Sequence, residues 1–391
     1  MNLPHIIAQP VRGSRFWNGH PWLYQGEIKW RPEDLPDGAV VIIKDVRARP
    51  LGTGLYNSKS QIAVRRFTTE IHMLGEKWIT QSLHRALALR SRLWNPLPEC
   101  HRVVFSESDG LPGLIIDRYG QALVVQTLTR AMDDRKALIT EILQKTLSPD
   151  LIVERNDSSS RLAEGLETKT GILAGTGPSR RVVTLNGVRF ELDFLDAQKT
   201  GLYLDQQAAY RQAMPYFKGR EVLDCFTYHG AFALHAALSG ASRVEGVDVS
   251  GPAIQQAEQN AKLNGAAIRF VESNAFDFLR EASDRGRQFD AIILDPPSFT
   301  KNKFKVSEAS KGYKEIHLRA LKMLRPGGIL MTFTCSHHVN FEMLRDIVVE
   351  AASDTRRPLR LREYCFQSPD HPILPEVPES EYLRGFIFEV R

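Results

Sequence analysis

Three apolar runs in the second half of the chain each lead into an acidic residue or a glycine-bearing turn, and this pattern constrains the fold. The runs cover 221–225, 243–248 and 289–294, and Gly230 and Asp295 lie just beyond two of them. Buried parallel strands read as continuous apolar runs, and doubly wound sheets bind ligands at the carboxyl ends of their strands. The sequence therefore predicts an α/β domain with a ligand site along one edge of a parallel sheet.

The same alternation of strand and helix signals continues to the end of the chain. Strands are expected near 221–225, 243–248, 268–272, 289–294 and 328–335, and helices near 231–239, 252–264, 275–283, 313–324 and 340–352. Pro-Gly-Gly at 326–328 is expected to end a helix and turn into the fifth strand, and a last strand is expected near 382–390. A hairpin over 182–192, with Asn186-Gly187 at its turn, leads into this domain.

Composition divides the chain into three predicted domains. Residues 1–70 have short apolar runs between Gly and Pro turns, which predicts a small β-barrel. Residues 71–185 combine a helical stretch near 77–93 with strand-like runs, which predicts a central α+β domain, and 186–391 form the α/β domain. The first domain also combines aromatic and basic side chains, as RNA-binding surfaces do, and the candidate RNA contacts include Arg15 and Lys44. Alternatively, its aromatic residues form the barrel core.

Charge and cysteine content narrow the class of protein. The 391 residues carry a net charge of +5, which permits a polyanionic partner without proving one. The four cysteines are too widely spaced for C-x-x-C metal pairs and too few for a disulfide framework, so a reducing cytoplasm fits best and no metal is expected. The chain opens with no signal pattern, and no apolar run approaches the ~20 residues that span a bilayer.

The turn after the first strand of the α/β domain argues against a dinucleotide site. It reads C-F-T-Y-H-G over 225–230, with one glycine where a pyrophosphate cradle needs G-x-G-x-x-G. S-adenosylmethionine has no phosphate, so it does not need a glycine-rich turn. The turn therefore fits this cofactor, and Phe226, Tyr228 and Gly230 are expected to contact it. Asp248 ends the second strand, where a carboxylate can accept hydrogen bonds from a ribose diol or cap the next helix.

The end of the third strand supplies the predicted contacts to adenine. Asn274, Ala275 and Phe276 lie there, and Asn274 could accept a hydrogen bond from the exocyclic amine or cap the next helix. The polar segment 196–207 precedes the first strand and adds Gln206 as a cofactor contact, unless it is an ordinary entry loop.

Lysines near the predicted site are candidate contacts to a nucleic-acid backbone. They are Lys199 in that entry segment and Lys301 and Lys303 in a basic run after the fourth strand. The alternative for such a run is a solvated surface.

Asp295-Pro-Pro-Ser298 follows the fourth strand. Consecutive prolines end sheet pairing and hold an extended loop, so Asp295 and the Pro297 carbonyl are expected at the sheet edge, Asp295 as a contact to the cofactor and Pro297 as a contact to the RNA. This arrangement suits recognition of a planar base beside a methyl donor. Because amino-group methyltransferases use a related D/N-P-P-Y/F pattern, the motif predicts methylation of a base without specifying the atom.

Cys335 lies in Thr-Cys-Ser at the end of the fifth strand, at the same edge as Asp295. A cysteine in a strand is usually only a small hydrophobic residue. A thiolate would have a specific task here, because carbon 5 of a pyrimidine takes a methyl group only after a nucleophile has added to carbon 6. Cys335 is therefore the predicted nucleophile, and the remaining cysteines are expected to be structural. Either neighbouring histidine, His337 or His338, could deprotonate the thiol or contact phosphate.

Together these residues resemble a known family, the bacterial class I S-adenosylmethionine-dependent 23S ribosomal RNA cytosine-5 methyltransferases that carry a PUA domain. The similarity extends over nearly the whole chain. Its motifs are G-H-P-W-L-Y at 19–24, E-S-D-G-L-P-G-L-I-I-D-R at 107–118, K-T-G-L-Y-L-D-Q at 199–206, K-G-Y-K-E-I at 311–316 and D-H-P-I at 370–373, with the D-P-P and T-C-S motifs.

The resemblance implies an amino-terminal PUA barrel, a middle α+β domain and a Rossmann-like methyltransferase domain of seven strands, the seventh antiparallel. It implies Cys335 as the nucleophile, Asp295 as the residue that positions the cytosine, and the turn at 226–230, Asp248 and Asn274 as cofactor contacts. The family often has an acidic residue in place of Asn274 and varies at Ser298. Since the D-P-P motif has no cysteine, the group that takes the carbon 5 proton stays open.

The sequence is thus interpreted as a cytoplasmic enzyme that uses S-adenosylmethionine to form 5-methylcytosine in large-subunit ribosomal RNA. Its predicted partner is ribosomal RNA, with no membrane, and a homodimer is a possible assembly. Two alternatives stay open, an amino-group methyltransferase acting on an RNA base through D-P-P-S and a catalytically inactive RNA-binding assembly protein.

Overall fold

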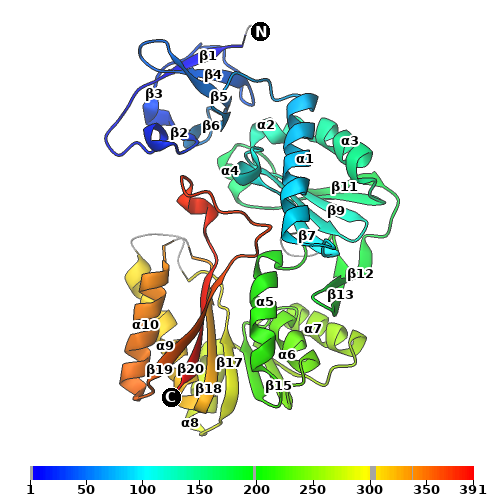
Figure 1. Cartoon of the computed structure of the whole chain (residues 1–391), viewed down its shortest axis with the longest axis vertical. Helices are drawn as coiled ribbons and strands as arrows, with labels where there is room; N and C mark the ends of the chain where they lie inside the picture. The colour runs from blue at the N-terminus through cyan, green and yellow to red at the C-terminus, as the bar shows by residue number, and fades with distance from the viewer. Residues whose placement is uncertain (1–2, 197–199, 300–304, 337) are drawn as a thin grey trace. The chain divides into compact units, whose positions relative to one another are not determined.

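The computed structural model describes residues 3–196, 200–299, 305–336 and 338–391. The chain divides into two compact units, each of which draws on several stretches of sequence (Figure 1). The first unit contains Met1–Val183, Leu192–Leu204 and Pro369–Ser380, and the second contains Thr184–Glu191, Asp205–Ser368 and Glu381–Arg391. The division into three domains at 70 and 185 remains a prediction.

The first seventy residues fold into a β-sheet of their own. Within the described residues its strands, in sheet order, are β2 (Trp22–Tyr24), β6 (Ile62–Thr68), β5 (Pro50–Tyr56), β4 (Val40–Lys44), β1 (His5–Ala8) and β3 (Ile28–Trp30). Leu23, Val41 and Val64 are buried between these strands, because alternate residues of a strand point to one face. The aromatic residues do not all belong to the core, since Phe16 is buried whereas Trp17 and Trp30 are exposed.

A second sheet of the first unit follows in sequence. Its described strands, in sheet order, are β11 (Lys169–Gly175), β10 (Leu151–Asn156), β9 (Ala122–Thr127), β8 (Leu114–Tyr119) and β7 (Cys100–Phe105). The helices that accompany it are α1 (Glu76–Leu93), α2 (Arg130–Asp133), α3 (Lys136–Leu147) and α4 (Ser160–Ala163). Helix α1 buries Ile79, Leu83 and Ala86, which recur at helical spacing along the face turned to the sheet.

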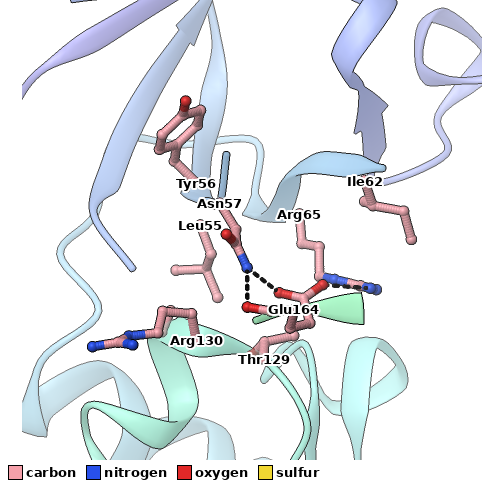
Figure 2. A pocket seen from close by; sticks show the side chains of 9 residues that line it. Leu55, Tyr56, Asn57, Ile62, Arg65, Thr129, Arg130 and Glu164 are labelled. Atoms are coloured by element: carbon pink, nitrogen blue, oxygen red, sulfur yellow. Dashed lines mark hydrogen bonds and ion pairs between the residues drawn. The ribbon is translucent and has the colours of Figure 1, made fainter. Parts of the chain in front are cut away.

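The two sheets of the first unit share both apolar and polar contacts. Leu55 of the first sheet belongs to the same hydrophobic cluster as Leu83 of α1. Figure 2 shows a buried polar pocket beside it, where Glu164 accepts hydrogen bonds from Asn57 Nδ2 at 2.7 Å and from Arg65 Nη2 at 3.3 Å. The first seventy residues therefore pack as part of a larger unit.

A short segment from the far end of the chain also belongs to the first unit. Asp370 Oδ2 accepts a hydrogen bond from the backbone N–H of Arg102 on the edge strand β7, at 2.7 Å. Glu379 pairs with Arg15 at 2.7 Å and lies 3.1 Å from His20 Nε2. Arg15, predicted to contact RNA, thus already has a carboxylate partner in this structure.

The second unit contains a mixed sheet of the kind expected. Seven strands of the described chain form it, in the order β16 (Arg269–Glu272), β15 (Arg243–Asp248), β14 (Glu221–Cys225), β17 (Phe289–Leu294), β18 (Leu324–Thr334), β20 (Arg384–Val390) and β19 (Leu359–Phe366). Strands β14 to β18 are mutually parallel, and β20 runs antiparallel to both of its neighbours. The antiparallel seventh strand is therefore confirmed.

Helices cover both faces of this sheet (Figure 1). They are α5 (Gln207–Ala213), α6 (Ala231–Leu238) and α7 (Gly251–Leu263) on one face, and α8 (Ala275–Asp284), α9 (Val306–Met323) and α10 (Phe341–Thr355) on the other. A two-stranded hairpin, β12 (Arg180–Leu185) and β13 (Val188–Asp193), precedes them. Its turn holds Asn186 at φ 51° and Gly187 at φ 85°, the left-handed conformation that an Asn-Gly hairpin requires.

Two expectations about this unit need correction, and one strand was not expected. Helix α9 begins at Val306, earlier than expected, because its first turn is polar and gave no apolar periodicity. Pro326-Gly-Gly328 lies inside β18, where the pairing with β17 shifts register, and does not precede the strand. Strand β19 was missed because it is an edge strand with several exposed charged side chains.

Among the helices within the described residues, none is long and apolar enough to cross a membrane.

Candidate active site

Four predicted site residues lie where neighbouring parallel strands end. Asp248 is the last residue of β15, Asn274 follows β16, Asp295 follows β17 and Cys335 follows β18. The carboxyl ends of parallel strands share one edge of a sheet, so the structure places all four along that edge. Asp295 and Cys335 follow strands that are direct neighbours.

The turn between β14 and α6 has an unusual backbone. Phe226, Tyr228 and Gly230 have φ values of 65°, 50° and 80°. Side chains other than glycine rarely adopt this region, and such strain is concentrated at functional sites. A Cβ atom at Gly230 would lie 3.1 Å from the ring of Phe270, so the turn needs glycine there for space as well as for conformation.

Asp224 stabilises this turn through two hydrogen bonds. Its Oδ2 accepts hydrogen bonds from Thr227 Oγ1 at 2.6 Å and from the N–H of Ala233 at 3.0 Å. Burial raises the pKa of Asp224 to about 7, despite these two donors. Its Oδ1 is buried and has no hydrogen-bond partner among the described residues, which leaves an acceptor for a ligand donor such as an amino group.

Asp248 is tied to the same turn. Its Oδ2 accepts from the N–H of Tyr228 at 2.9 Å, and its Oδ1 accepts from the N–H of Ser250 at 3.0 Å. Ser250, whose side chain accepts from the N–H of Ala253, is the N-cap of α7, so the capping alternative for Asp248 is wrong. Each carboxylate oxygen keeps a lone pair that can accept from a ribose hydroxyl.

Asp248→Ala is expected to weaken cofactor binding by ~1 to 3 kcal/mol, because it removes a charged hydrogen-bond acceptor from the ribose diol. Calorimetric titration measures the effect. Asp277→Ala is the matched control, since Asp277 is an exposed aspartate on α8 that pairs with Arg280. Equal affinities of the Asp248 variant and the control would remove Asp248 from the site.

The third strand ends in a capped helix. Asn274 accepts a hydrogen bond from the N–H of Phe276 at 2.9 Å and is the N-cap of α8, so its capping role is confirmed. Ala275 is buried, and the Phe276 ring lies 5.5 Å from that of Phe299. The contacts of these residues with adenine remain predictions.

Asp295 is held by Gln206. Gln206 Nε2 donates to Asp295 Oδ2 at 2.9 Å, and the Gln206 side chain is buried. The structure thus brings the entry segment to the D-P-P loop, where Asp295 is half-buried and Pro297 is exposed. Gln206 Oε1 is buried without a partner among the described residues, so it can accept a hydrogen bond from a bound molecule.

Cys335 differs from the other three cysteines, all four of which lie in the described chain. Cys100, Cys225 and Cys365 are buried, and burial raises the pKa of each thiol, that of Cys365 to about 12. Cys335 is only partly buried and follows β18, the neighbour of the strand that Asp295 follows. Cys225, assigned to the cofactor turn, is the last residue of β14. Among the four cysteines Cys335 is the most accessible to a bound molecule, and its role as the nucleophile remains a prediction.

Sequence reasoning missed an aromatic cluster beside these residues. Phe299 of the D-P-P loop lies 6.4 Å from Phe226, 5.5 Å from Phe276 and 4.6 Å from Tyr313, as ring centroid distances. Tyr313 is fully buried on α9. The K-G-Y-K-E-I match contained this tyrosine, but one sequence could not show that it reaches the sheet edge.

Other predicted contacts fall outside this edge or outside the described residues. Lys199, Lys301, Lys303 and His337 lie outside the described residues. His338 is exposed, and Lys44 is half-buried at the end of β4.

The described residues fit a cofactor that has a ribose and an amino group but no phosphate. Asp248 offers acceptors for a diol, and Asp224 Oδ1 offers a buried acceptor at the turn. The turn itself has one glycine and bulky neighbours, so it cannot provide the row of backbone amides that a pyrophosphate needs. This combination matches S-adenosylmethionine.

Comparisons with known proteins agree. A family model described as "S-adenosylmethionine-dependent methyltransferase" matches residues 166–388, and one described as "PUA-like domain" matches 7–69. "Ribosomal RNA large subunit methyltransferase I" of Alteromonas mediterranea is 36% identical over 391 residues, covering 98% of each chain. The protein with this name from Photobacterium profundum is 37% identical and covers 95% of this chain and 96% of its own.

The fold is also found in solved structures. A protein crystallised in complex with SAH superposes with a TM-score of 0.85 at 19% sequence identity, covering 99% of this chain and 100% of its own. A SAM-dependent methyltransferase from Agrobacterium tumefaciens superposes with a TM-score of 0.53 at 19% identity, covering 74% and 90%. The chain belongs to the S-adenosylmethionine-dependent methyltransferase family and carries a PUA-like domain at its amino-terminal end.

Proposed function

We propose that this methyltransferase forms 5-methylcytosine in large-subunit ribosomal RNA. The single observation that carries the proposal is the placement of Cys335, the one cysteine of the four described that is not buried, beside Asp295 at the cofactor edge of the sheet. The ribosomal substrate is supported by the names of relatives that match this chain over nearly its whole length.

The reaction divides between the two residues. The Cys335 thiolate adds to carbon 6 of the cytosine, which makes carbon 5 nucleophilic. S-adenosylmethionine supplies the methyl group that carbon 5 then takes. Loss of the carbon 5 proton expels the thiolate and restores the aromatic ring.

Asp295 is assigned to holding the base. Its bond from Gln206 fixes one carboxylate oxygen, and the two prolines that follow fix the backbone. A carboxyl group held in this way can hydrogen-bond the ring and stabilise the charge that develops when the thiolate adds. Asp295 is therefore proposed to orient the cytosine and to stabilise the charge that develops on its ring.

The other enzymatic alternative is methylation of an amino group by the same D-P-P-S loop. That reaction needs no thiolate, so Cys335 would have no catalytic role in it. Nucleoside mass spectrometry of RNA methylated by the pure enzyme separates the two, because 5-methylcytosine and N4-methylcytosine are distinguishable by chromatography. 5-Methylcytosine supports the proposal, and an amino-methylated base overturns it. Absence of transfer to any ribosomal RNA substrate would favour an inactive assembly protein.

The PUA-like domain is proposed to hold the RNA through its basic residues. Lys44→Ala is expected to weaken RNA binding and to lower the slope of log K against log salt by about 0.7 to 0.9, the value for one lost phosphate contact. Cofactor affinity should not change. Lys145→Ala is the control, because it makes the same charge change on the exposed face of α3. Equal salt slopes for the two variants would exclude Lys44 from the RNA-binding surface.

A further inference from the structure

Tyr313 lies at the junction of the two loops that carry the proposed catalytic groups. It is fully buried on α9, and its hydroxyl lies 2.9 Å from Thr334 Oγ1, the residue immediately before Cys335. Thr334 Oγ1 also accepts a hydrogen bond from the N–H of Ser336 at 3.2 Å. The Thr334 hydroxyl therefore links Tyr313 to the backbone on both sides of Cys335.

The same tyrosine contacts the loop that carries Asp295. The Tyr313 ring packs against the ring of Phe299, with ring centroids 4.6 Å apart. Phe299 follows directly after the D-P-P-S motif. One side chain thus contacts both the T-C-S segment, through its hydroxyl, and the D-P-P loop, through its ring.

The surroundings hold Tyr313 in one place. The Tyr313 carbonyl bonds to His317 Nδ1 at 2.6 Å, and His317 Nε2 bonds to Thr332 Oγ1 on β18 at 2.7 Å. Gly312 leaves room for Phe299, since a Cβ atom there would already touch its ring at 3.5 Å. Helix α9 is therefore connected to β18 by two polar contacts, one turn apart.

Tyr313 is a hydrogen-bonding group and not an acid or base near neutral pH. Burial is the main cause that raises the pKa of its hydroxyl to about 12, and the nearby Cys335 and Asp295 charges raise it further. It therefore keeps its proton throughout the range in which the enzyme would work.

We infer that Tyr313 is a positioning residue, which sets the spacing of Cys335 and Asp295 by bonding to the T-C-S segment and packing against the D-P-P loop. The inference rests on the proposed function, because it concerns the geometry of the same reaction. Catalytic groups must be held to within a fraction of an ångström, so loss of the Tyr313 hydroxyl should slow the chemical step without weakening binding.

The test is Tyr313→Phe, which keeps the buried ring and removes only the hydroxyl. Its kcat is expected to fall roughly 10- to 100-fold, while KM for RNA and the affinity for S-adenosylmethionine stay within about twofold. The shape of the pH–rate profile should be unchanged, because no titrating group is removed. Tyr216→Phe is the matched control, because it removes a tyrosine hydroxyl that bonds Glu363 on β19. Neither residue belongs to the D-P-P loop or the T-C-S segment, so this variant should keep the wild-type kcat.

A second variant isolates the hydroxyl pair. Thr334→Val should also lower kcat, and adding Tyr313→Phe to it should cost little more, since both substitutions remove the contact between the two hydroxyls. Thiol alkylation with peptide mapping monitors folding, because only Cys335 should label in a folded variant while the three buried cysteines stay protected.

The outcomes distinguish a failure of the role of Tyr313 from a failure of the proposed function. A wild-type kcat in folded Tyr313→Phe, or additive losses in the double variant, overturns the role of Tyr313 alone. A wild-type enzyme that forms no covalent adduct through Cys335 with its RNA overturns the proposed function itself. A selective loss of kcat with non-additive coupling supports the inference.

Discussion

Cys335→Ala is expected to reduce methyl transfer by at least about 10,000-fold while the protein stays folded, because the thiolate activates carbon 5. Cofactor affinity should be unchanged, since Cys335 follows β18 and the predicted contacts to the ribose and the adenine lie at the ends of β15 and β16. Initial rates with tritiated cofactor, and calorimetric titration of the cofactor, measure the two quantities.

Cys225→Ala is the matched control for that variant. Cys225 is fully buried at the end of β14, so its substitution should cost some stability but leave measurable activity. Substantial activity in Cys335→Ala would contradict the covalent mechanism and favour amino-group methylation.

Asp295→Asn should lower kcat by roughly 100-fold or more, the loss typical when one group that stabilises a developing charge is removed. The asparagine has the same shape and can still accept the hydrogen bond from Gln206, so the loop should stay in place. KM for RNA should change much less than kcat. Steady-state kinetics over a range of RNA concentrations measure both.

Asp346→Asn controls for that substitution, because Asp346 is an exposed aspartate on α10. If Asp295→Asn raised KM and spared kcat, Asp295 would only bind the base and would not assist the chemical step.

Much of the sheet edge could be predicted from the sequence because its signals are local. Apolar runs define β14, β15 and β17, and chain order places Asp248 at the end of β15 and Asp295 directly after β17. Consecutive prolines at 296–297 mark the end of a strand in any context.

What the sequence could not provide are contacts between distant segments. Tyr313 meets Thr334 and Phe299 only because α9 packs against β18, and no local pattern encodes that packing. The ion pair of Arg15 with Glu379 joins residues 364 positions apart, so a basic residue expected to meet RNA has a carboxylate partner that periodicity cannot show. Strand β19 was not predicted because it is an edge strand, and most of its side chains are exposed and give little apolar pattern.

Covalent trapping tests the central claim most directly. RNA that carries 5-fluorocytosine at the target should form a stable adduct with the wild-type enzyme and cofactor, because fluorine blocks the proton loss that releases the thiolate. Protease digestion and mass spectrometry then locate the modified residue. The account predicts an adduct on Cys335, together with none in Cys335→Ala. An adduct on another cysteine, or methyl transfer to RNA with no adduct at all, would contradict it.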